Sequence, residues 1–237
     1  MISIVVPTYR EVDNLPLLAK AVDETMSSLG RPYELLFIDD DSRDGAEEVC
    51  AKLSETLPVR IVVRKGQRGL ATAVLHGISL CSGEIIVVMD ADLSHPSDAI
   101  PHMLVRLESG ESDFVLGSRH VRGGSIHEEW SATRRLGSTL ASRLAKPLCS
   151  LEDPMSGFFA FRRIDMPDTN RLRPIGYKIA LELLVKGDFR HPTEVPIHFA
   201  SRRHGESKLS LAEHWRFLRH LCRLYAFKLH AGRGRLR

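Results

Sequence analysis

Apolar runs of strand length alternate with stretches of helical periodicity along the first half of the chain. Apolar positions recur at spacings of three and four over 15–29, 44–57, 70–80 and 96–107, which predicts helices. Largely unbroken apolar runs predict buried strands at 2–6, 33–38, 59–63, 84–89 and 114–117. Buried strands separated by helices are typical of a parallel sheet covered on both faces. The sequence therefore predicts an α/β fold with a mostly parallel central sheet.

The alternation loosens in the second half of the chain. We expect further helices over 131–148 and 176–186, and strands over 158–161 and 193–199. Asn14, followed by Leu15 and Pro16, is expected to cap the first helix. No internal repeat or low-complexity segment occurs. The predicted organisation is one domain over 1–210, followed by a C-terminal extension over 211–237.

The extension combines an apolar stripe with positive charge, although the formal net charge of the chain is only +3. The stripe consists of Leu211, Trp215, Leu218, Cys222, Tyr225 and Leu229, and it is flanked by Arg216, His220 and Arg223. A basic amphipathic helix with Trp and Tyr is typical of a helix lying in the interface of a membrane. The alternative is that this stripe packs on the domain.

Composition is that of an ordinary globular protein, with 43% hydrophobic and 27% charged residues among 237. No run approaches the ~18 apolar residues that cross a bilayer. The N-terminal residues lack a basic leader, so we expect a core strand there and not a signal peptide. Four scattered cysteines without metal-binding spacing fit a reducing cytoplasm.

Charged residues directly follow the predicted strands, at 7–11, 39–41, 64–68, 90–92 and 118–119. Ligands of open parallel sheets bind beyond the carboxyl ends of the strands, so we expect the chemistry at this edge. A dinucleotide fingerprint is excluded because the first strand-to-helix turn contains no glycine, and no Walker A loop occurs. No Ser-His-Asp or Cys-His arrangement is evident, and His95 is the only histidine near the expected site.

Two acidic clusters follow predicted strands. Asp90 and Asp92 repel each other at the end of a buried strand, and a hard divalent cation relieves this repulsion well. The alternative is a pair of acids that caps the following turn. Asp39, Asp40 and Asp41 can accept hydrogen bonds from a base or a ribose. Such acids suit guanine and uracil equally, and an Asx turn is the alternative there.

A basic cluster is expected to hold phosphate. It consists of Arg119, Arg134, Arg135, Arg202, Arg203 and Lys208. Arg134 and Ser138 lie four residues apart on a predicted helix, hence on one face, where a guanidinium and a hydroxyl can cradle a phosphate. Arginines on the surface of an amphipathic helix are the alternative. Nucleic-acid binding is not expected, because the basic residues are not interleaved with aromatic ones.

Six motifs that span residues 2–210 in order carry a family resemblance. They are VVPTYRE (5–11), FIDDDS (37–42), MDADLSHP (89–96), GSR (117–119), DPMSGFF (153–159) and GESKL (205–209). Together they resemble the dolichol-phosphate (polyprenol-phosphate) mannose synthases, inverting enzymes of glycosyltransferase family 2 with the Rossmann-like GT-A fold. The resemblance implies GDP-mannose as donor, a polyprenyl or dolichyl phosphate as acceptor and Mg²⁺ or Mn²⁺ as cofactor.

The resemblance also implies residue roles. The nucleotide sugar would contact Pro7, Tyr9, Glu11, Asp39, Asp41 and Ala91, and later Arg202 and Lys208 as a loop closes. Asp90 and Asp92 would bind the metal, and Ser94, where some relatives have glutamine, would reach it through a water. The acceptor phosphate would be held by Arg119, Arg134 and Ser138, which with Asp92 form the catalytic set. Glu182 stands at a position that the family also makes acidic, without an assigned role.

The implied mechanism needs no general base, because a phosphate monoester is already ionised near pH 7. Metal stabilisation of the leaving diphosphate and positioning by arginines remain, and a single in-line displacement inverts the anomeric carbon. The lipid acceptor implies a peripheral protein on the cytoplasmic face of a membrane, alone or with a small membrane subunit. Two rivals stay open: a UDP-glucose-dependent synthase of the same fold, and a non-catalytic nucleotide-binding membrane adaptor.

Overall fold

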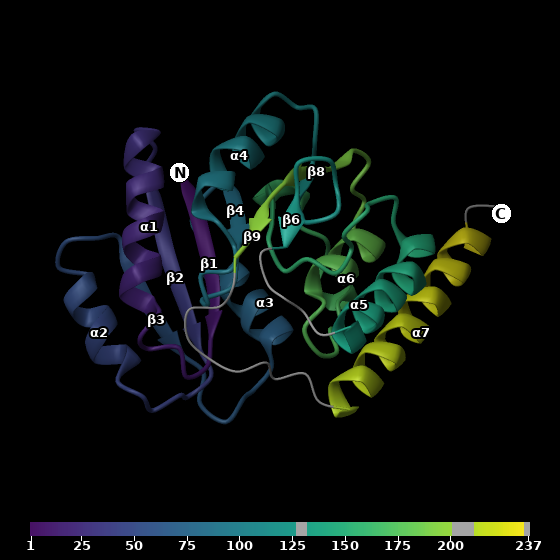
Figure 1. The fold of residues 1–237 in the computed structure, drawn as a ribbon, viewed down its shortest axis with the longest axis horizontal. Coiled ribbons are helices and arrows are strands. Elements are labelled where there is room, and N and C mark those ends of the chain that lie inside the picture. Colours follow the sequence, from purple (N-terminus) through teal and green to yellow (C-terminus); the bar gives the residue numbers. More distant parts are fainter. Residues whose placement is uncertain (127–131, 201–210, 235–237) are drawn as a thin grey trace.

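A seven-stranded sheet forms the centre of the molecule in the computed structural model, which describes residues 1–126, 132–200 and 211–234 (Figure 1). The strand order is β3-β2-β1-β4-β7-β5-β8. The strands are β1 (Ile2–Thr8), β2 (Tyr33–Asp39), β3 (Val59–Val63), β4 (Ile85–Val88), β5 (Phe114–Ser118), β7 (Phe159–Arg162) and β8 (Pro192–Pro196). Only β7 runs antiparallel to its neighbours, so the mostly parallel sheet predicted from the apolar runs is confirmed.

Helices cover both faces of the sheet. They are α1 (Leu15–Ser28), α2 (Ala46–Leu53), α3 (Leu70–Leu80), α4 (Ile100–Glu108), α5 (Ala132–Ala145), α6 (Ile179–Lys186) and α7 (Leu211–Gly234). Short 3-10 turns occur at Ser97–Ala99, Lys146–Leu148, Arg163–Asp165 and Thr169–Arg171. The core under one face takes residues from α1, α2 and α4, and the core under the other takes residues from α3 and α6.

Alternation along the strands explains this division of the core. Ile4 and Val6 of β1 join the cluster under α1, whereas Val5 joins the cluster under α3, because successive side chains of a strand point to opposite faces. Helix α3 lies very close to the sheet at Gly77, where an added Cβ would stand 2.4 Å from a methyl of Val5. A glycine is therefore required at that contact.

Local features differ from the predictions, and α2 and α4 are shorter than the helices predicted over 44–57 and 96–107. Asn14 does precede α1, but its side chain makes no capping bond and its amide instead donates to Glu11 at 2.7 Å. The strand predicted over 193–199 is divided at Ile197 into β8 and β9 (His198–Phe199). A two-residue strand, β6 (Ser125–Ile126), pairs with β9 and was not predicted, since two residues carry no periodicity.

Helix α7 packs against α5 and α6 through a face that the apolar stripe did not indicate. Phe217, Leu221 and Leu224 are buried there, together with Leu181 of α6 and Ala145 of α5. Trp215, Leu218 and Leu229 of the predicted stripe are exposed outside this contact, whereas Tyr225 packs against its margin. Among the described residues, no helix has both the length and the apolarity needed to cross a membrane.

Candidate active site

The carboxyl ends of the parallel strands meet at one edge of the sheet. β1 ends at Thr8, whose ladder partner is Asp39, the last residue of β2. Asp90 lies two residues beyond β4, which flanks β1 on its other side, and Arg119 directly follows β5. These side chains therefore come to the same edge, although they are far apart in the sequence.

Asp39 is buried and its carboxylate is held by its neighbours. One oxygen accepts hydrogen bonds from the hydroxyls of Thr8, at 3.1 Å, and Ser42, and the other accepts the backbone N–H of Ser42 at 2.8 Å. Asp41 follows with a left-handed φ of 56° and forms an ion pair with Arg43 at 2.9 Å. Asp39 thus stabilises a turn, and these three bonds leave about one of its four acceptor positions for a ligand.

Asp40 has a structural role that sequence reasoning did not identify. It forms a buried ion pair with Arg64, with 2.5 Å between Oδ1 and Nη2, and it accepts the N–H of Gly69 at 2.7 Å. Arg64 also donates to the hydroxyl of Thr72 at 3.2 Å. These contacts join the ends of β2 and β3 to the start of α3, so they fix the loop over 64–69 at the edge of the site.

The loop after β1 carries the residues predicted to hold the nucleoside. The guanidinium of Arg68 lies over the ring of Tyr9, 4.5 Å from its centroid, and that of Arg10 lies 5.3 Å from it. Pro7 belongs to β1, and Glu11 accepts the Asn14 amide described above. The loop is joined to the end of β2 by the Thr8–Asp39 hydrogen bond and by the N–H of Arg10, which donates to the Ser42 hydroxyl at 2.8 Å. Nucleoside binding by this loop stays a prediction.

Asp90 and Asp92 occupy the turn after β4 and differ in exposure. The side chain of Asp90 is 33% exposed, whereas Asp92 and the intervening Ala91 are buried. Asp92 Oδ1 accepts hydrogen bonds from the hydroxyl of Ser94 at 2.5 Å and from its N–H at 3.1 Å. The Ser94 hydroxyl therefore holds Asp92 in place, and its water-mediated contact with a metal stays a prediction.

His95 supports the turn that carries Asp90 and Asp92. Its Nδ1 accepts the backbone N–H of Asp90 at 2.9 Å, which leaves Nε2 as the protonated nitrogen of the neutral ring. The ring stacks on Phe158 with 5.2 Å between centroids and contacts the edge of Phe199. Burial lowers the pKa of His95, so a neutral imidazole is expected near pH 7. The sequence placed His95 near the site, and the structure places it against Asp90.

The acid pair fits a divalent cation whose coordination is shared with a substrate. Mg²⁺ and Mn²⁺ are commonly held by one or two carboxylates, with phosphate oxygens and waters completing the shell. Asp90 reaches the solvent, and Asp92 stands two residues away on the same turn. Within the described residues no group of three or more His, Cys, Asp or Glu could enclose a metal. Two carboxylates on one turn suit a cation whose remaining ligands come from substrate phosphates and water.

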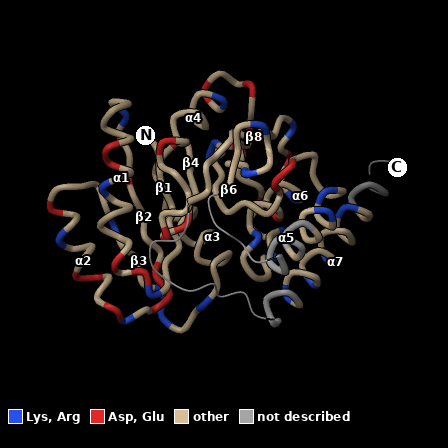
Figure 2. Tube along the Cα trace, viewed as in Figure 1, with Lys and Arg blue, Asp and Glu red and all other residues tan. Residues whose placement is uncertain are grey.

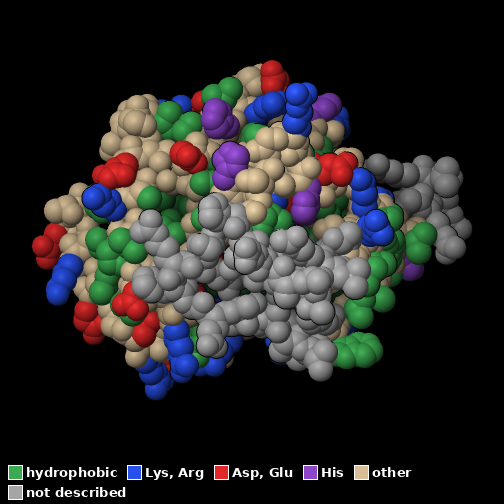
Figure 3. Space-filling model, in the orientation of Figure 1, with side chains coloured by type: hydrophobic (Ala, Val, Ile, Leu, Met, Phe, Trp, Pro, Cys, Tyr) green, Lys and Arg blue, Asp and Glu red, His purple; other side chains and the backbone are tan. Residues whose placement is uncertain are grey.

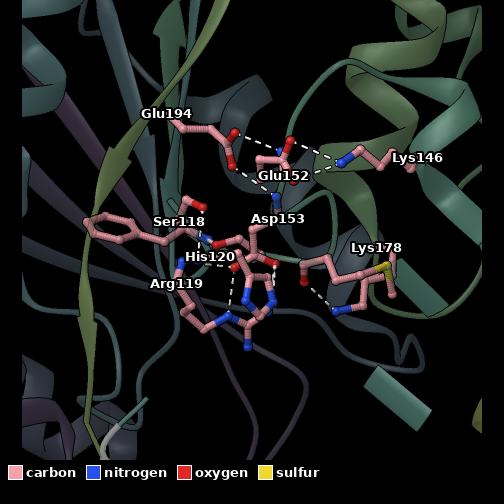
Figure 4. Close-up of polar contacts among 11 residues, drawn as sticks. Ser118, Arg119, His120, Lys146, Glu152, Asp153, Lys178 and Glu194 are labelled. Carbon is pink, nitrogen blue, oxygen red and sulfur yellow. Dashed lines mark hydrogen bonds and ion pairs between the residues drawn. The ribbon is translucent and has the colours of Figure 1, made fainter. Parts of the chain in front are cut away.

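Arg119 is held by Asp153 in a bidentate ion pair (Figure 4). Its Nε and Nη2 donate to the two carboxylate oxygens at 2.7 and 2.8 Å, and its backbone N–H donates at 3.1 Å. Burial raises the pKa of Asp153, but the hydrogen bonds and charge of Arg119 outweigh it and hold the pKa below its usual value. The pair is therefore ionised and rigid at neutral pH.

The segment that carries Asp153 is itself anchored and reaches the acid pair. The two carboxylate oxygens of Glu194, in β8, accept the backbone N–H groups of Asp153, at 2.9 Å, and Glu152, at 2.7 Å. Farther along the segment, a Cβ added at Gly157 would lie 3.5 Å from Asp90 Oδ1. The Arg119–Asp153 pair and the acid pair are thus adjacent parts of one site.

Asp153 and Lys178 were not singled out from the sequence. Asp153 opens the motif at 153–159, so the family resemblance was the available signal for it. Lys178 directly precedes α6 and is a partly buried residue, and its ammonium group donates to the Met155 carbonyl at 2.5 Å. No sequence signal distinguished this lysine, because its surroundings read as the start of a helix.

Several predicted phosphate ligands cannot be located. Arg134 and Ser138 both lie in α5, as predicted, but their side chains are outside what the structure describes. Arg202, Arg203 and Lys208 lie wholly outside the described residues. Their predicted contacts with phosphates therefore stay predictions.

Comparison with known proteins assigns the class. The profile described as glycosyl transferase family 2 matches residues 3–166. The chain belongs to this family.

Three curated relatives are described as dolichol-phosphate mannosyltransferases. The one from Pyrococcus furiosus is 40% identical over 94% of this chain and 63% of its own length, so the chain spans less than two thirds of that protein. Those from Mycosarcoma maydis and Saccharomyces cerevisiae are 42% and 40% identical over 95% and 97% of this chain, and 79% and 88% of their own lengths.

Solved structures agree on the fold. Glucosyl-3-phosphoglycerate synthase from Mycobacterium tuberculosis, in complex with Mn²⁺, UDP and glucosyl-3-phosphoglycerate, superposes with a TM-score of 0.63 at 19% identity. Its complex with Mg²⁺ and UDP gives a TM-score of 0.64 at 19% identity. Both matches cover 96% of this chain and 79% of the other. They establish a GT-A-like architecture, as the family resemblance implied.

Proposed function

We propose that this chain is an inverting dolichol-phosphate mannosyltransferase, which transfers mannose from GDP-mannose to a polyprenyl or dolichyl phosphate. The proposal is carried by two neighbouring charged groups, of which one is suited to bind a cation and the other to bind a phosphate. Asp90 and Asp92 offer carboxylates to a cation, and the Arg119–Asp153 pair lies directly beside them. The three curated relatives share about 40% identity with nearly the whole chain, which supports the same activity.

The reaction is a single displacement. An oxygen of the acceptor phosphate attacks the anomeric carbon of mannose, the bond from that carbon to the donor diphosphate breaks, and GDP leaves with the bonding electrons. Asp90 and Asp92 would hold Mg²⁺ or Mn²⁺, which neutralises charge on the departing diphosphate. Arg119 would orient the acceptor phosphate, because its two side-chain hydrogen bonds to Asp153 fix the position of the guanidinium.

GDP-mannose is the proposed donor and UDP-glucose its rival. Asp39 and Asp41 can serve either base, so the choice rests on the mannosyltransferase relatives. The test is transfer of labelled mannose from GDP-mannose to a short polyprenyl phosphate, with UDP-glucose as a parallel donor. We expect turnover with GDP-mannose that is abolished by a chelator and restored by Mg²⁺ or Mn²⁺. Faster transfer of glucose would favour the rival, and binding of nucleotide without transfer would favour the adaptor.

Peripheral attachment to the cytoplasmic face of a membrane is proposed through the outer face of α7. Trp215, Leu218 and Leu229 have exposed fractions of 73%, 41% and 67%, and they continue the predicted apolar stripe. Figure 3 shows hydrophobic side chains along this edge of the molecule, and Figure 2 shows basic residues spaced along α7. Arg216, Arg219 and Arg223 are exposed on the same helix, as anionic lipid headgroups require. A small membrane subunit could share this surface.

The division into a catalytic domain over 1–210 and a membrane helix over 211–237 is likewise a proposal. Because Phe217 and Leu224 bury one face of α7, removing this helix would expose the core beneath it. Liposome flotation should therefore use substitutions on the outer face and not a truncation.

A further inference from the structure

The sheet stops supporting the chain just before Asp90. β4 ends at Val88, and the N–H of Met89 still donates to the carbonyl of Val5 at 3.1 Å. The next N–H, that of Asp90, donates instead to Nδ1 of His95 at 2.9 Å. The carboxylate of Asp90 faces the same ring, with 3.9 Å between Oδ2 and Nε2. The position of Asp90 therefore depends on a side chain and not on the sheet.

The ring of His95 is itself held in place. Its residue is only 3% exposed, and it stacks on Phe158 while the edge of Phe199 lies 5.6 Å away between centroids. A Cβ added at Gly157 would stand 3.5 Å from Cε1 of the ring, so that side is closed as well. A ring enclosed in this way cannot turn freely, which keeps Nδ1 directed at one backbone N–H.

The turn that carries the two acids needs such support. Leu93 lies between them and His95 with a φ of 62°, in the left-handed region that bulky side chains rarely adopt. A residue in that region costs free energy and persists only where the surrounding contacts hold it. The bond from Asp90 to His95 and the bonds from Ser94 to Asp92 are such contacts. The relative position of the two carboxylates therefore depends on them.

The affinity of a carboxylate site for a hard cation depends on where its oxygens stand. Mg²⁺ requires nearly ideal octahedral geometry, and replacing a residue that orients a metal ligand typically weakens metal binding ~10- to 100-fold. We propose that His95 is a positioning residue for the divalent cation, because through Nδ1 it fixes the backbone of Asp90 relative to Asp92. This inference rests on the metal assignment within the proposed function. It adds a residue that contacts a metal ligand and not the metal itself.

The test distinguishes the two ring nitrogens. The amide oxygen of asparagine reaches about as far from the backbone as Nδ1 of histidine, whereas the amide group of glutamine reaches to the position of Nε2. His95→Asn therefore keeps an acceptor for the Asp90 N–H, and His95→Gln displaces it. His102→Gln, an exposed change on α4, is the matched control.

The measurement is the Kd for Mn²⁺ of the protein–GDP complex, by electron paramagnetic resonance with protein in excess over nucleotide. We expect His95→Gln to raise this Kd by ~10- to 100-fold, and His95→Asn to recover most of the affinity. The Kd for GDP in the presence of a chelator should be unchanged in both variants, because the metal is then absent. A role of His95 in folding alone would not separate these two constants.

Three outcomes would overturn the inference. They are an unchanged Kd for Mn²⁺ in His95→Gln, a Kd for Mn²⁺ in His95→Asn as high as in His95→Gln, and a Kd for GDP with chelator that rises as much as that for Mn²⁺. Thermal unfolding without ligand checks that each variant folds, and if His95→Gln does not, His95→Ala takes its place. A wild type that binds Mn²⁺ but transfers no mannose would contradict the proposed function alone, so the two failures are distinguishable.

Discussion

Glu182 of α6 and His220 of α7 form a buried polar contact, with 2.8 Å between Oε2 and Nε2. Both side chains are almost completely inaccessible to solvent. The other carboxylate oxygen accepts hydrogen bonds from the ammonium group of Lys186 and the backbone N–H of Arg173, each at 2.6 Å. Burial raises the pKa of Glu182, but these hydrogen bonds, led by that of His220, outweigh it and lower the pKa overall. This contact gives Glu182 a structural role that the sequence could not assign: it joins α7 to the helix that follows Lys178.

Replacing His220 with alanine is expected to loosen α7. The change removes one hydrogen bond from a buried carboxylate and opens space beside Phe217 and Leu221, which should cost ~2–3 kcal/mol. The midpoint of thermal unfolding should then fall by ~5–10 °C. Arg219→Ala, an exposed change one residue earlier on the helix, should alter the midpoint little. Equal midpoints for the two variants would show that the Glu182–His220 contact does not hold the helix.

Replacing Asp92 with alanine is expected to remove nearly all turnover while the fold is kept. Asp92 is predicted to hold the cation that neutralises the leaving diphosphate, and the loss of such an interaction typically costs at least ~100-fold in rate. The measurement is mannose transfer over a range of Mn²⁺ concentrations, with Asp188→Ala on an exposed turn as control. Wild-type rates in Asp92→Ala at saturating Mn²⁺ would remove the metal assignment.

Most of the fold followed from periodicity because its strands are buried and its helices are amphipathic. β3 and α3 match the predicted bounds, and β1 and β2 extend each prediction by one or two residues. The short strand β6 and the division at Ile197 were not predictable, because both depend on pairing between β6 and β9, which are far apart in the sequence. The buried face of α7 was also missed. Apolar residues lie on two sides of that helix, and its sequence does not tell which side meets α5 and α6.

The position of a site residue was predictable where that residue directly follows a strand. Its role was not predictable where a tertiary contact determines its partner. Asp90, Asp39 and Arg119 come to one edge because parallel strands end there. The partnership of Arg119 with Asp153 joins two loops 34 residues apart, and no local pattern encodes it. The same holds for Asp40, which looks like its two acidic neighbours in sequence but is neutralised by Arg64.

Replacing Asp153 with asparagine is expected to lower kcat/KM by ~100-fold, because Arg119 loses its charged anchor. The pKa of Asp153 is depressed in the folded protein, so its contribution to stability is present above the unfolded value of about 4 and is lost as pH falls through the lower folded value. The wild type should therefore unfold at a higher temperature than Asp153→Asn at neutral pH, and this difference between the two midpoints should shrink below pH ~4. A constant excess across that range would contradict the ionised pair.

Replacing Trp215 and Leu218 together with serine is expected to weaken membrane binding without disturbing the fold. Both side chains are exposed, so the loss concerns apolar area that a bilayer would bury. Flotation with liposomes that contain anionic lipid should show at least a ~10-fold weaker partition for the double variant. Leu17→Ser, at an exposed apolar position on α1, is the control. Equal flotation of both variants would place the membrane contact elsewhere.

Replacing Lys178 with methionine is expected to stabilise the protein at low pH, because it removes a charge that burial makes unfavourable. The pKa of Lys178 falls from about 10.5 to about 7 on folding. Between these pH values the unfolded chain binds a proton that the folded protein does not, so wild-type stability rises with pH across this window. Below pH 7 both states are protonated, and the folded protein bears the full unfavourable energy of that charge. Lys178→Met removes that energy, so its unfolding midpoint at pH 6 should exceed that of the wild type by roughly 3–10 °C. The difference should narrow as pH rises toward 10, while Lys20→Met, an exposed change on α1, should match the wild type throughout. A lower midpoint for Lys178→Met at pH 6 would mean that the ammonium group has a stabilising partner in the free protein.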